Sequence, residues 1–331
     1  MRGVNSPHPE LFALALVSSL ALGVAALPTA QAQVYPGKPV RFIIPFPPGG
    51  PTDILGRVVS HQLTEVWNMQ VIADNRPGAG GNFGTELCAK APPDGYTMCM
   101  ISIAQTISPS IYPNLSFDPV ADFAHVTLLA TLPSLLLVHP SLPARNVKEL
   151  IALAKVKPGA LNYASGGSGT SSQMLMELFK LNGGINIVHI PYKGTGPALI
   201  DQLSGQIEVA FSTIIAALPY AESGRLRMIA VSTKQRFPQL PTVPTIDESG
   251  LKGFDGGSWQ GLIMPAGTPR DVISKVNADL VKMLTSTAMK DKILTMGGIT
   301  LGDTPAEFAA YTKAEVAKWA KVVKAAGIRG E

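Results

Sequence analysis

The feature that most constrains the fold of this chain is a repeated unit, in which a short β-rich run leads through a glycine-rich turn into an amphipathic helix. Such units begin at residues 40–46, 69–73, 161–164 and 187–190. In the first unit we expect Thr52 and Asp53 to supply the N-cap of the helix, because short polar side chains accept hydrogen bonds from its first N–H groups. Alternating strands and helices predict an α/β fold with parallel or mixed sheets covered on both faces.

Composition narrows the function. The chain has 331 residues, 46% of them apolar and 15% charged, which is enough to bury a large core in about two domains. Its net charge of +4 comes from scattered lysines and arginines, so we expect no nucleic-acid partner. The histidines and the two cysteines lie far apart without metal-ligand spacing, and we therefore predict no metal site and no cofactor.

The N-terminus carries a targeting signal. Arg2 precedes the charge-free apolar run 11–27, and Ala30-Gln31-Ala32 matches the pattern that signal peptidase reads. We predict a signal peptide over residues 1–32, cleaved after Ala32, and a mature protein in the periplasm. At 17 residues the run is at the short limit for a membrane span, so an uncleaved anchor is the alternative.

Export gives the two cysteines a second interpretation. Cys88 ends a predicted helix and Cys99 lies in the strand that follows it. In an oxidising compartment the pair can form a disulfide, and otherwise the two are small buried thiols. The sequence leaves both alternatives open.

The glycine-rich turns can be compared with three enzyme or nucleotide-binding motifs, and they match none of them. The dinucleotide pattern G-x-G-x-x-G has Phe83 in place of its third glycine. No turn contains the Gly-Lys-Ser/Thr of a P-loop, and the G-x-S-x-G pattern around Ser168 ends in Thr170. We therefore do not expect an enzyme.

These turns are suited to anion binding. A helix N-terminus presents free N–H groups with a partial positive charge, and glycine lets a carboxylate approach the backbone. Hydroxyl donors are available from Thr52, Ser168, Thr170 and Ser171. Neither the 47–53 turn nor the 165–171 turn contains Lys or Arg, so neutral donors must hold the anion, which fits reversible capture better than catalysis.

Asp53 is the exception in the first turn, since one carboxylate repels another. One interpretation makes it a helix acid that the dipole favours. The other has it orient waters or an amino group of the ligand. The sequence favours the first.

Several segments in this order resemble the tripartite tricarboxylate transporter receptors, also called Bug-type solute-binding proteins. The resemblance extends from about Tyr35 to the last helix. It is carried by RFIIPFPPGGPTDILGRVV (41–59), NRPGAGGNFGTELCAKAPPDGYT (75–97), HIPYKGTGPALIDQLSGQIEVAF (189–211), LPTVPT (240–245) and SWQGLIMPAGTP (258–269).

The resemblance implies a monomeric, two-lobed periplasmic binding protein (Venus flytrap, type II-like), each lobe a mixed sheet flanked by helices. Residues 33–130 with 253–331 would form lobe 1, and residues 131–252 lobe 2. A ligand carboxylate would be gripped between the 46–53 and 165–171 turns, with the 192–195 loop at its distal end. The ligand-binding residues predicted in this way are Phe46, Pro48, Gly49, Gly50, Thr52, Asp53, Ser165, Gly167, Ser168, Gly169, Thr170, Ser171, Tyr192, Gly194, Thr195 and Ser212.

The chain departs from the family pattern at three positions. Ser168 stands where Asn is common, Gln173 where His is common, and Ser212 where Asp often occurs. An Asp at 212 would suit an amino or hydroxyl group of a ligand, and Ser212 therefore weakens the transfer of such a ligand to this chain.

The sequence predicts a periplasmic receptor that captures a small organic carboxylate and delivers it to the membrane permease subunits of a tripartite transporter. The alternative is a carboxylate-sensing receptor that presents its bound state to a membrane sensor kinase. A third hypothesis, an exported hydrolase using Ser168 or Ser171, has the least support because no partner histidine and acid suggest themselves.

Overall fold

The computed structural model describes residues 1, 3 and 35–328 and divides the chain into two compact units, residues 1–37 and 38–331. The described residues of the first unit contain no helix or strand. The apolar run and the cleavage site of the predicted signal peptide lie outside the described residues. All helices, strands and cavities below belong to the second unit.

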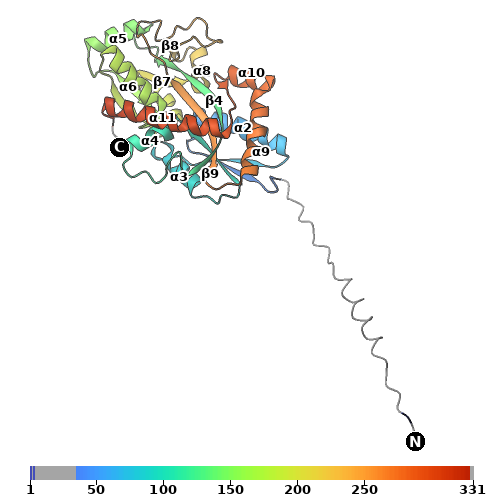
Figure 1. The fold of residues 1–331 in the computed structure, drawn as a ribbon. Helices are drawn as coiled ribbons and strands as arrows, with labels where there is room; N and C mark the ends of the chain where they lie inside the picture. Colours follow the sequence, from blue (N-terminus) through green and yellow to red (C-terminus); the bar gives the residue numbers. More distant parts are fainter. Residues whose placement is uncertain (2, 4–34, 329–331) are drawn as a thin grey trace. The chain divides into compact units, whose positions relative to one another are not determined.

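The second unit is built on one mixed sheet (Figure 1). Its main path runs β2-β1-β3-β9-β4-β7-β5-β6, and β8 and β10 also pair with β4. Strands β1 to β3 are parallel to one another, as are β5 to β7, whereas β4 and β9 are antiparallel to their neighbours. The strands are β1 (Val40–Ile44), β2 (Val71–Asn75), β3 (Thr97–Ser102), β4 (Phe123–Val138), β5 (Asn162–Ser165), β6 (Val188–Pro191), β7 (Val209–Thr213), β8 (Arg227–Val231), β9 (Gly257–Pro265) and β10 (Ile299–Thr300).

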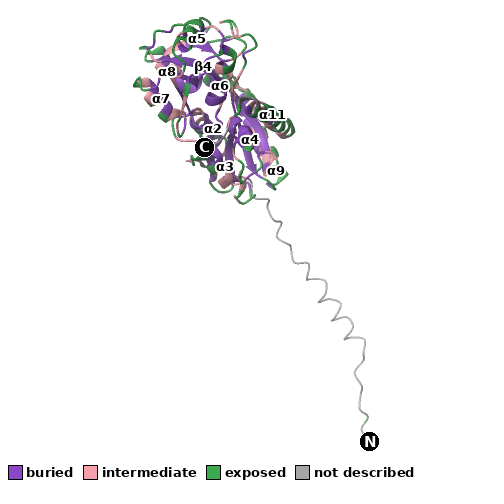
Figure 2. Ribbon diagram, turned by 90° about the vertical axis from the view of Figure 1, so that its left-hand side faces the viewer, coloured by how far each residue is buried: buried purple, intermediate pink, exposed green. Residues whose placement is uncertain are grey.

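Helices cover both faces of the sheet, and the interior between them is buried (Figures 1 and 2). This confirms the predicted α/β class. The helices are α2 (Pro51–Trp67), α3 (Asn82–Ala89), α4 (Ile103–Ile111), α5 (Val147–Val156), α6 (Ser171–Gly183), α7 (Thr195–Leu203), α8 (Ile214–Glu222), α9 (Arg270–Thr285), α10 (Thr287–Thr295) and α11 (Pro305–Ala326), with a short 3-10 turn at Ala79–Gly81.

Strand β4 shows how the two faces are filled. Successive side chains of a strand point to opposite faces. Leu136 and Val138 accordingly join the core with α5 and α6, whereas Leu135 and Leu137 join the core with α8. A further core packs α3, α4 and α11 against β1, β3 and β9. The last four residues of the 16-residue strand β4 are therefore apolar on both sides.

Strand β4 also joins two parts of the sheet. Up to Pro133 it pairs with β9, and from Ser134 onward it pairs with β7 and β8. The returning chain lies beside this point, because Ser232 bonds Ser134 and Gly256 through its backbone and hydroxyl. The change of partner falls three residues from the predicted lobe boundary at 130–131, which stays a prediction.

One local expectation is wrong. Helix α2 begins at Pro51 with Gly50 as its N-cap, so Thr52 and Asp53 occupy the second and third helical positions. Proline is favoured at the first helical position, where its missing N–H costs nothing and its fixed φ suits the helix. Pro51 therefore sets the start of the helix, ahead of the polar residues that follow.

Cys88 in α3 and Cys99 in β3 are fully buried free thiols. Burial raises the pKa of the Cys88 thiol, and its contact with Cys99 raises that pKa further. The Cys88 sulfur therefore stays protonated, and both cysteines lie within one apolar core.

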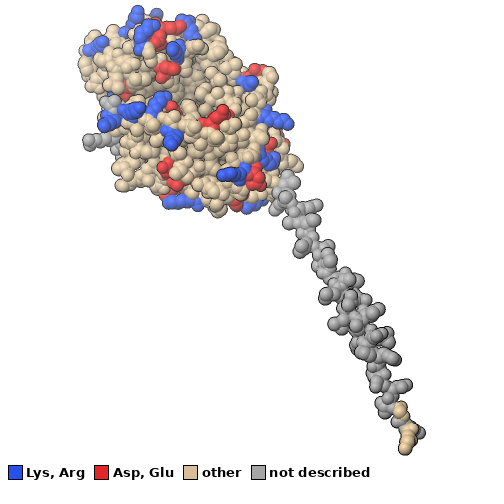
Figure 3. All heavy atoms as spheres, in the orientation of Figure 1, with Lys and Arg blue, Asp and Glu red and all other residues tan. Residues whose placement is uncertain are grey.

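The surface gives no sign of a large single-sign field on the face in Figure 3, where acidic and basic side chains are interspersed. Among the residues that the structure describes, no helix is both long enough and apolar enough to cross a membrane.

A methyl group at Gly261 should disrupt the packing of α11 on β9. An added Cβ would lie 2.1 Å from Cζ of Phe308. We expect Gly261→Ala to lower the free energy of unfolding by about 1–3 kcal/mol through overpacking. Gly257→Ala in the same strand is the control, because its Cβ would meet nothing closer than 3.4 Å. Urea denaturation measures both, and equal stabilities would contradict this packing.

Acid should weaken the fold through His125, which is buried in β4 and packs edge-on against Phe308. Burial lowers the pKa of His125 to about 4, and hydrogen bonds to the backbone of Phe123 and Pro119 offset this only in part. The unfolded chain takes up this proton near pH 6.5, so the free energy of unfolding falls as the pH drops from about 6.5 towards about 4.

We expect His125→Gln to flatten this fall between about pH 5 and 6.5, where most carboxylates stay ionised. Urea unfolding at a series of pH values measures the slope. The same slope in the variant and the unmodified protein would show that His125 does not carry it.

Candidate ligand-binding site

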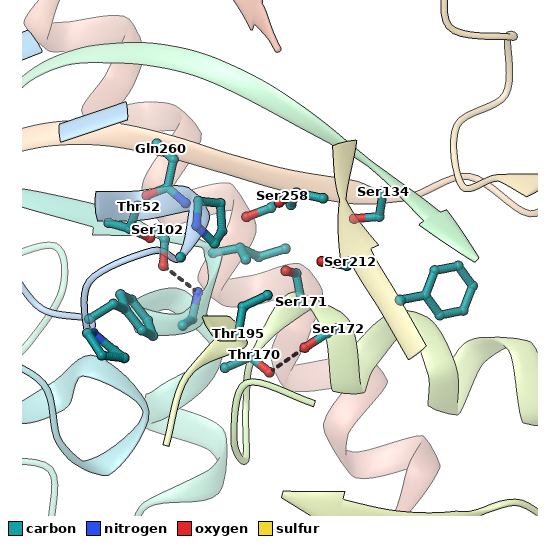
Figure 4. A pocket seen from close by; sticks show the side chains of 18 residues that line it. Thr52, Ser102, Ser134, Thr170, Ser171, Ser172, Thr195, Ser212, Ser258 and Gln260 are labelled. Carbon is teal, nitrogen blue, oxygen red and sulfur yellow. Dashed lines mark hydrogen bonds between the residues drawn. The ribbon is translucent and has the colours of Figure 1, made fainter. Parts of the chain in front are cut away.

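Five helices begin at one cavity. Helices α2, α4, α6, α7 and α8 follow β1, β3, β5, β6 and β7, so each starts beyond the carboxyl end of a strand. This is the edge at which α/β sheets bind ligands. The N-cap or first residue of each helix lines the cavity, namely Gly50, Ser102, Thr170, Thr195 and Thr213 (Figure 4).

Most of these helix starts have free donors. Helix α4 is capped by its own Ser102, whose hydroxyl accepts the N–H of Ala104 at 3.3 Å. The starts of α2, α6, α7 and α8 receive no side-chain capping bond from the described residues. Their first N–H groups and the helix dipoles therefore give the cavity a positive potential, which favours an anion.

The cavity wall is polar but uncharged. The cavity volume is about 40 Å³, whereas roughly 10–15 Å³ is enough to hold one water. The eighteen lining residues include no Lys, Arg, His, Asp or Glu. They are Phe46, Pro47, Gly50, Pro51, Thr52, Ser102, Ile103, Ala104, Ser134, Thr170, Ser171, Ser172, Thr195, Phe211, Ser212, Thr213, Ser258 and Gln260.

Three buried polar atoms of this wall have no hydrogen-bond partner among residues 35–328. They are Oγ of Ser212, Oγ1 of Thr213 and Oε1 of Gln260. All three residues are less than 5% exposed. Buried polar groups are nearly always paired in native proteins, so unpaired ones around a cavity indicate that a ligand completes them.

The carboxylate of Asp53 is bonded within its own surroundings and does not belong to the cavity wall. It is 3% exposed, and its carboxylate accepts hydrogen bonds from the N–H of Gly49 (3.0 Å) and from Asn75 (2.9 Å) and pairs with Arg57 (2.9 Å). Burial raises the pKa of the Asp53 carboxyl group, but these partners lower that pKa by a larger amount. The pKa of Asp53 therefore lies below its ordinary value. Asp53 is not among the lining residues, and it holds the 47–53 turn in shape.

The 165–171 turn is also held by its own side chains. Ser165 bonds the backbone of Gly167, and Thr170 donates to the Gly167 carbonyl at 2.7 Å. The amide oxygen of Gln173 accepts the N–H of Gly169 at 2.7 Å. These contacts fix the start of α6, so that Thr170, Ser171 and Ser172 all reach the cavity.

Loops from the two parts of the sheet touch beside the cavity. A Cβ on Gly194 would lie 2.3 Å from Cγ of Pro47, and one on Gly196 would lie 3.1 Å from the carbonyl oxygen of Pro48. Gly194 also has φ +121°, which side chains rarely adopt. Glycine is therefore required here for the two loops to meet.

A larger cavity of about 710 Å³ adjoins the same loops and shares Phe46 and Pro47 with the first. Its wall includes Tyr112, Ser168 and Tyr192. The Tyr192 hydroxyl donates to Asp201 at 2.7 Å, and burial together with this carboxylate raises the pKa of Tyr192 to about 12. Tyr192 therefore stays neutral and is oriented by Asp201.

A serine–histidine contact lies behind the cavity, where Oγ of Ser165 is 2.6 Å from Nε2 of His189. A catalytic serine needs a histidine oriented by an acid and an exposed oxygen. Here Nδ1 of His189 faces the amide of Gln173 at 3.4 Å, and Ser165 is 1% exposed. The geometry is that of a partly buried structural pair. No group of three or more potential metal ligands occurs in the described part of the chain.

The structure divides the sixteen predicted ligand residues. Phe46, Gly50, Thr52, Thr170, Ser171, Thr195 and Ser212 line the 40 Å³ cavity. Gly167, Ser168, Tyr192 and Gly194 line the larger one. Pro48 and Gly49 lie in a surface groove, Ser165 lines a small adjoining pocket, and Asp53 and Gly169 line none of these.

Sequence reasoning did not find several lining residues. Ser102 had a usable signal, since Ser102-Ile103-Ala104-Gln105 reads as a capping box behind a strand. Ser134, Ser258 and Gln260 lie inside strands, and the SWQGLIMPAGTP segment, although it carries the resemblance, did not mark Ser258 or Gln260 as ligand residues. Only the pairing of β4 with β7 and β9 brings them to the cavity.

The chain was compared with known proteins. The model of the tripartite tricarboxylate transporter family receptor matches residues 55–328. Protein BugT of Bordetella pertussis is 33% identical over 93% of this chain and 94% of its own length.

Solved structures are also similar. The structure of Rpa4515 of R. palustris with adipate has a TM-score of 0.88 at 34% identity, and covers 90% of this chain and 100% of its own. The periplasmic binding protein BugD has a TM-score of 0.86 at 32% identity, with coverages of 90% and 100%. MatC of Rhodopseudomonas palustris with bound malate has a TM-score of 0.82 at 29% identity, with coverages of 87% and 100%.

Fold and cavity together define a two-lobed periplasmic binding protein. Within that class, the chain belongs to the tripartite tricarboxylate transporter receptor family. This confirms the resemblance seen in the sequence. The family is one of solute-binding receptors.

Two serines of similar burial should respond oppositely to alanine. Ser165 has three close polar contacts, whereas Oγ of Ser212 has none within the described residues. We expect Ser165→Ala to lower the free energy of unfolding by about 1–3 kcal/mol, and Ser212→Ala to leave it unchanged or raise it by up to about 1 kcal/mol. Urea denaturation of the ligand-free protein measures both. An equal loss in the two variants would contradict the assignment of Ser212 Oγ as unpaired.

Proposed function

We propose that the protein is a periplasmic receptor that captures a small organic carboxylate and delivers it to the membrane permease subunits of a tripartite transporter. The observation that carries the proposal is the uncharged cavity at which five helices begin, with unpaired hydroxyl and amide oxygens in its wall. Two relatives of known structure are described with dicarboxylates, adipate and malate.

The energetics suit reversible capture. Each helix end contributes about 0.3–1 kcal/mol to an anion at the surface and up to about 2 kcal/mol when partly buried. Several ends and hydroxyl bonds together reach the roughly −8 kcal/mol of micromolar affinity. No catalytic group is assigned to the wall among residues 35–328, and the activity proposed is binding and release of an unchanged acid.

Closure would link binding to delivery. We take residues 33–130 with 253–331 as one lobe and residues 131–252 as the other, turning about the point where β4 changes partners. A ligand between the 46–53 and 165–171 turns would bridge the lobes and favour the closed form that a permease recognises. The apolar run 11–27, with cleavage after Ala32, would direct export. We expect the exported receptor to be a monomer.

Thermal denaturation of the purified protein tests the proposal against a panel of C4–C6 di- and tricarboxylates and aromatic acids, each with its amide as the control. A ligand that binds only the native state raises the melting temperature by mass action. We expect at least one acid to raise it while its amide does not. No shift with any acid, in folded protein, would contradict carboxylate capture.

Thr52→Val should locate the site, because it removes one cavity hydroxyl and keeps the side-chain shape. We expect about a tenfold loss of affinity for the acid identified, as one hydrogen bond to a charged group contributes about 1.5 kcal/mol or more. Thr285→Val on the exposed face of α9 is the control and should bind normally. Unchanged affinity in Thr52→Val would exclude the start of α2 from the site.

A further inference from the structure

The charge balance of the 40 Å³ cavity limits which carboxylates it accepts. Its wall holds five helix starts and no carboxylate side chain. Asp53, on the neighbouring turn, accepts bonds from Gly49 and Asn75 and pairs with Arg57, and is therefore committed elsewhere. An ammonium group in this cavity would meet the positive ends of the helix dipoles without a counter-charge.

The unpaired atoms show what the cavity offers to the rest of a ligand. Oγ of Ser212 and Oγ1 of Thr213 come from β7, and Oε1 of Gln260 comes from β9. A hydroxyl both donates and accepts, whereas an amide oxygen only accepts. The two hydroxyls can donate to a carboxylate or pair with a hydroxyl group, and the amide oxygen of Gln260 can accept from a ligand hydroxyl; none of these contacts needs an opposite charge.

Their positions are rigid. Gln260 pairs with Ser102 on one side and with Ala130 on the other, and Ser212 pairs with Leu135, so both are anchored in the middle of the sheet. Figure 4 shows Gln260, Ser258, Ser134 and Ser212 along one side of the cavity, with Thr170, Ser172 and Thr195 across from them. The strand pairing therefore fixes the backbone at Gln260 and Ser212, and neither residue carries a charge that could pair with an ammonium group.

We infer that this receptor selects short carboxylates and hydroxycarboxylates that carry no amino group, and rejects amino acids of the same length. The inference rests on the proposed function and adds the substrate class. The absence of any counter-charge in the wall supplies the discrimination. The hydroxyls of Ser212 and Thr213 donate to a second carboxylate or hydroxyl of the ligand, and the amide oxygen of Gln260 accepts from a ligand hydroxyl.

Matched pairs of acids test the inference on the purified protein by isothermal titration calorimetry. The pairs are succinate and aspartate, malate and aspartate, and glutarate and glutamate. We expect at least one amine-free member to bind, and its amino partner to bind about a hundredfold more weakly or not at all.

The Gln260→Glu variant provides a second test, because it replaces an amide oxygen in the wall by a carboxylate of nearly the same shape. We expect the amino member of a pair to gain at least about tenfold relative to its amine-free partner. Gln235→Glu, which makes the same change at an exposed position, is the control and should keep the original ratio.

The outcomes distinguish failure of the amine exclusion from failure of carboxylate capture. Equal binding of both members of a pair would overturn the amine exclusion and leave carboxylate capture standing. Binding of none of these acids, nor of any other acid in the wider panel, would overturn the proposed function and the inference with it. If Gln260→Glu does not fold, the pairs measured on the unmodified protein decide alone. If it folds and the ratio is unchanged, the missing counter-charge is not the cause of the selectivity.

Discussion

The free N–H groups at the starts of α2, α6, α7 and α8 are the constraint on which the rest of this structure depends. A helix cannot satisfy its own first donors, and these four ends receive no side-chain cap from the described residues. The strand–turn–helix repeat places such helix ends at the carboxyl ends of the strands. Helix starts that follow β1 and β3 and helix starts that follow β5, β6 and β7 all line one cavity. The protein thus concentrates positive potential without burying a single charged side chain in the wall. Buried cations would need either partners or a shift to the neutral form, and neutral donors avoid both.

The strands that join the two parts of the sheet also contact the cavity. Ser134 lies where β4 leaves β9 for β7, and Ser258 lies next to Gly257, which pairs with Pro133. Ser232 bonds Ser134 of β4 and Gly256, the residue before β9, at this level. Under the proposed lobe closure, a ligand that contacts Ser134 and Ser258 would act on the segments about which the lobes bend, so binding and bending would be coupled at the same residues.

The sequence predicted the α/β class because strand, turn and helix signals are local and recur with clear punctuation. It also predicted the two turns of the cavity, since glycine and hydroxyl residues before a helix have a direct physical meaning. Local signals misplaced the N-cap of α2, where Pro51 competed with Thr52 and Asp53. They also did not indicate that the carboxylate of Asp53 would be occupied by Arg57 and Asn75. Ser134, Ser258 and Gln260 could not be found in this way, because their position depends on pairing between strands far apart in the chain.

The contact between Gly194 and Pro47 has a consequence for how tightly any ligand is held. The two loops meet only because residue 194 has no side chain. A larger residue at position 194 would clash with Pro47 and reduce the fraction of molecules that can reach the closed arrangement. The apparent dissociation constant rises in inverse proportion to that fraction, with every atom around the ligand unchanged. Under the proposed closure, part of the receptor's affinity would therefore be encoded in the missing side chain of Gly194, which does not itself line the 40 Å³ cavity. Natural variation at this position would tune how much solute is retained without altering which solute is chosen.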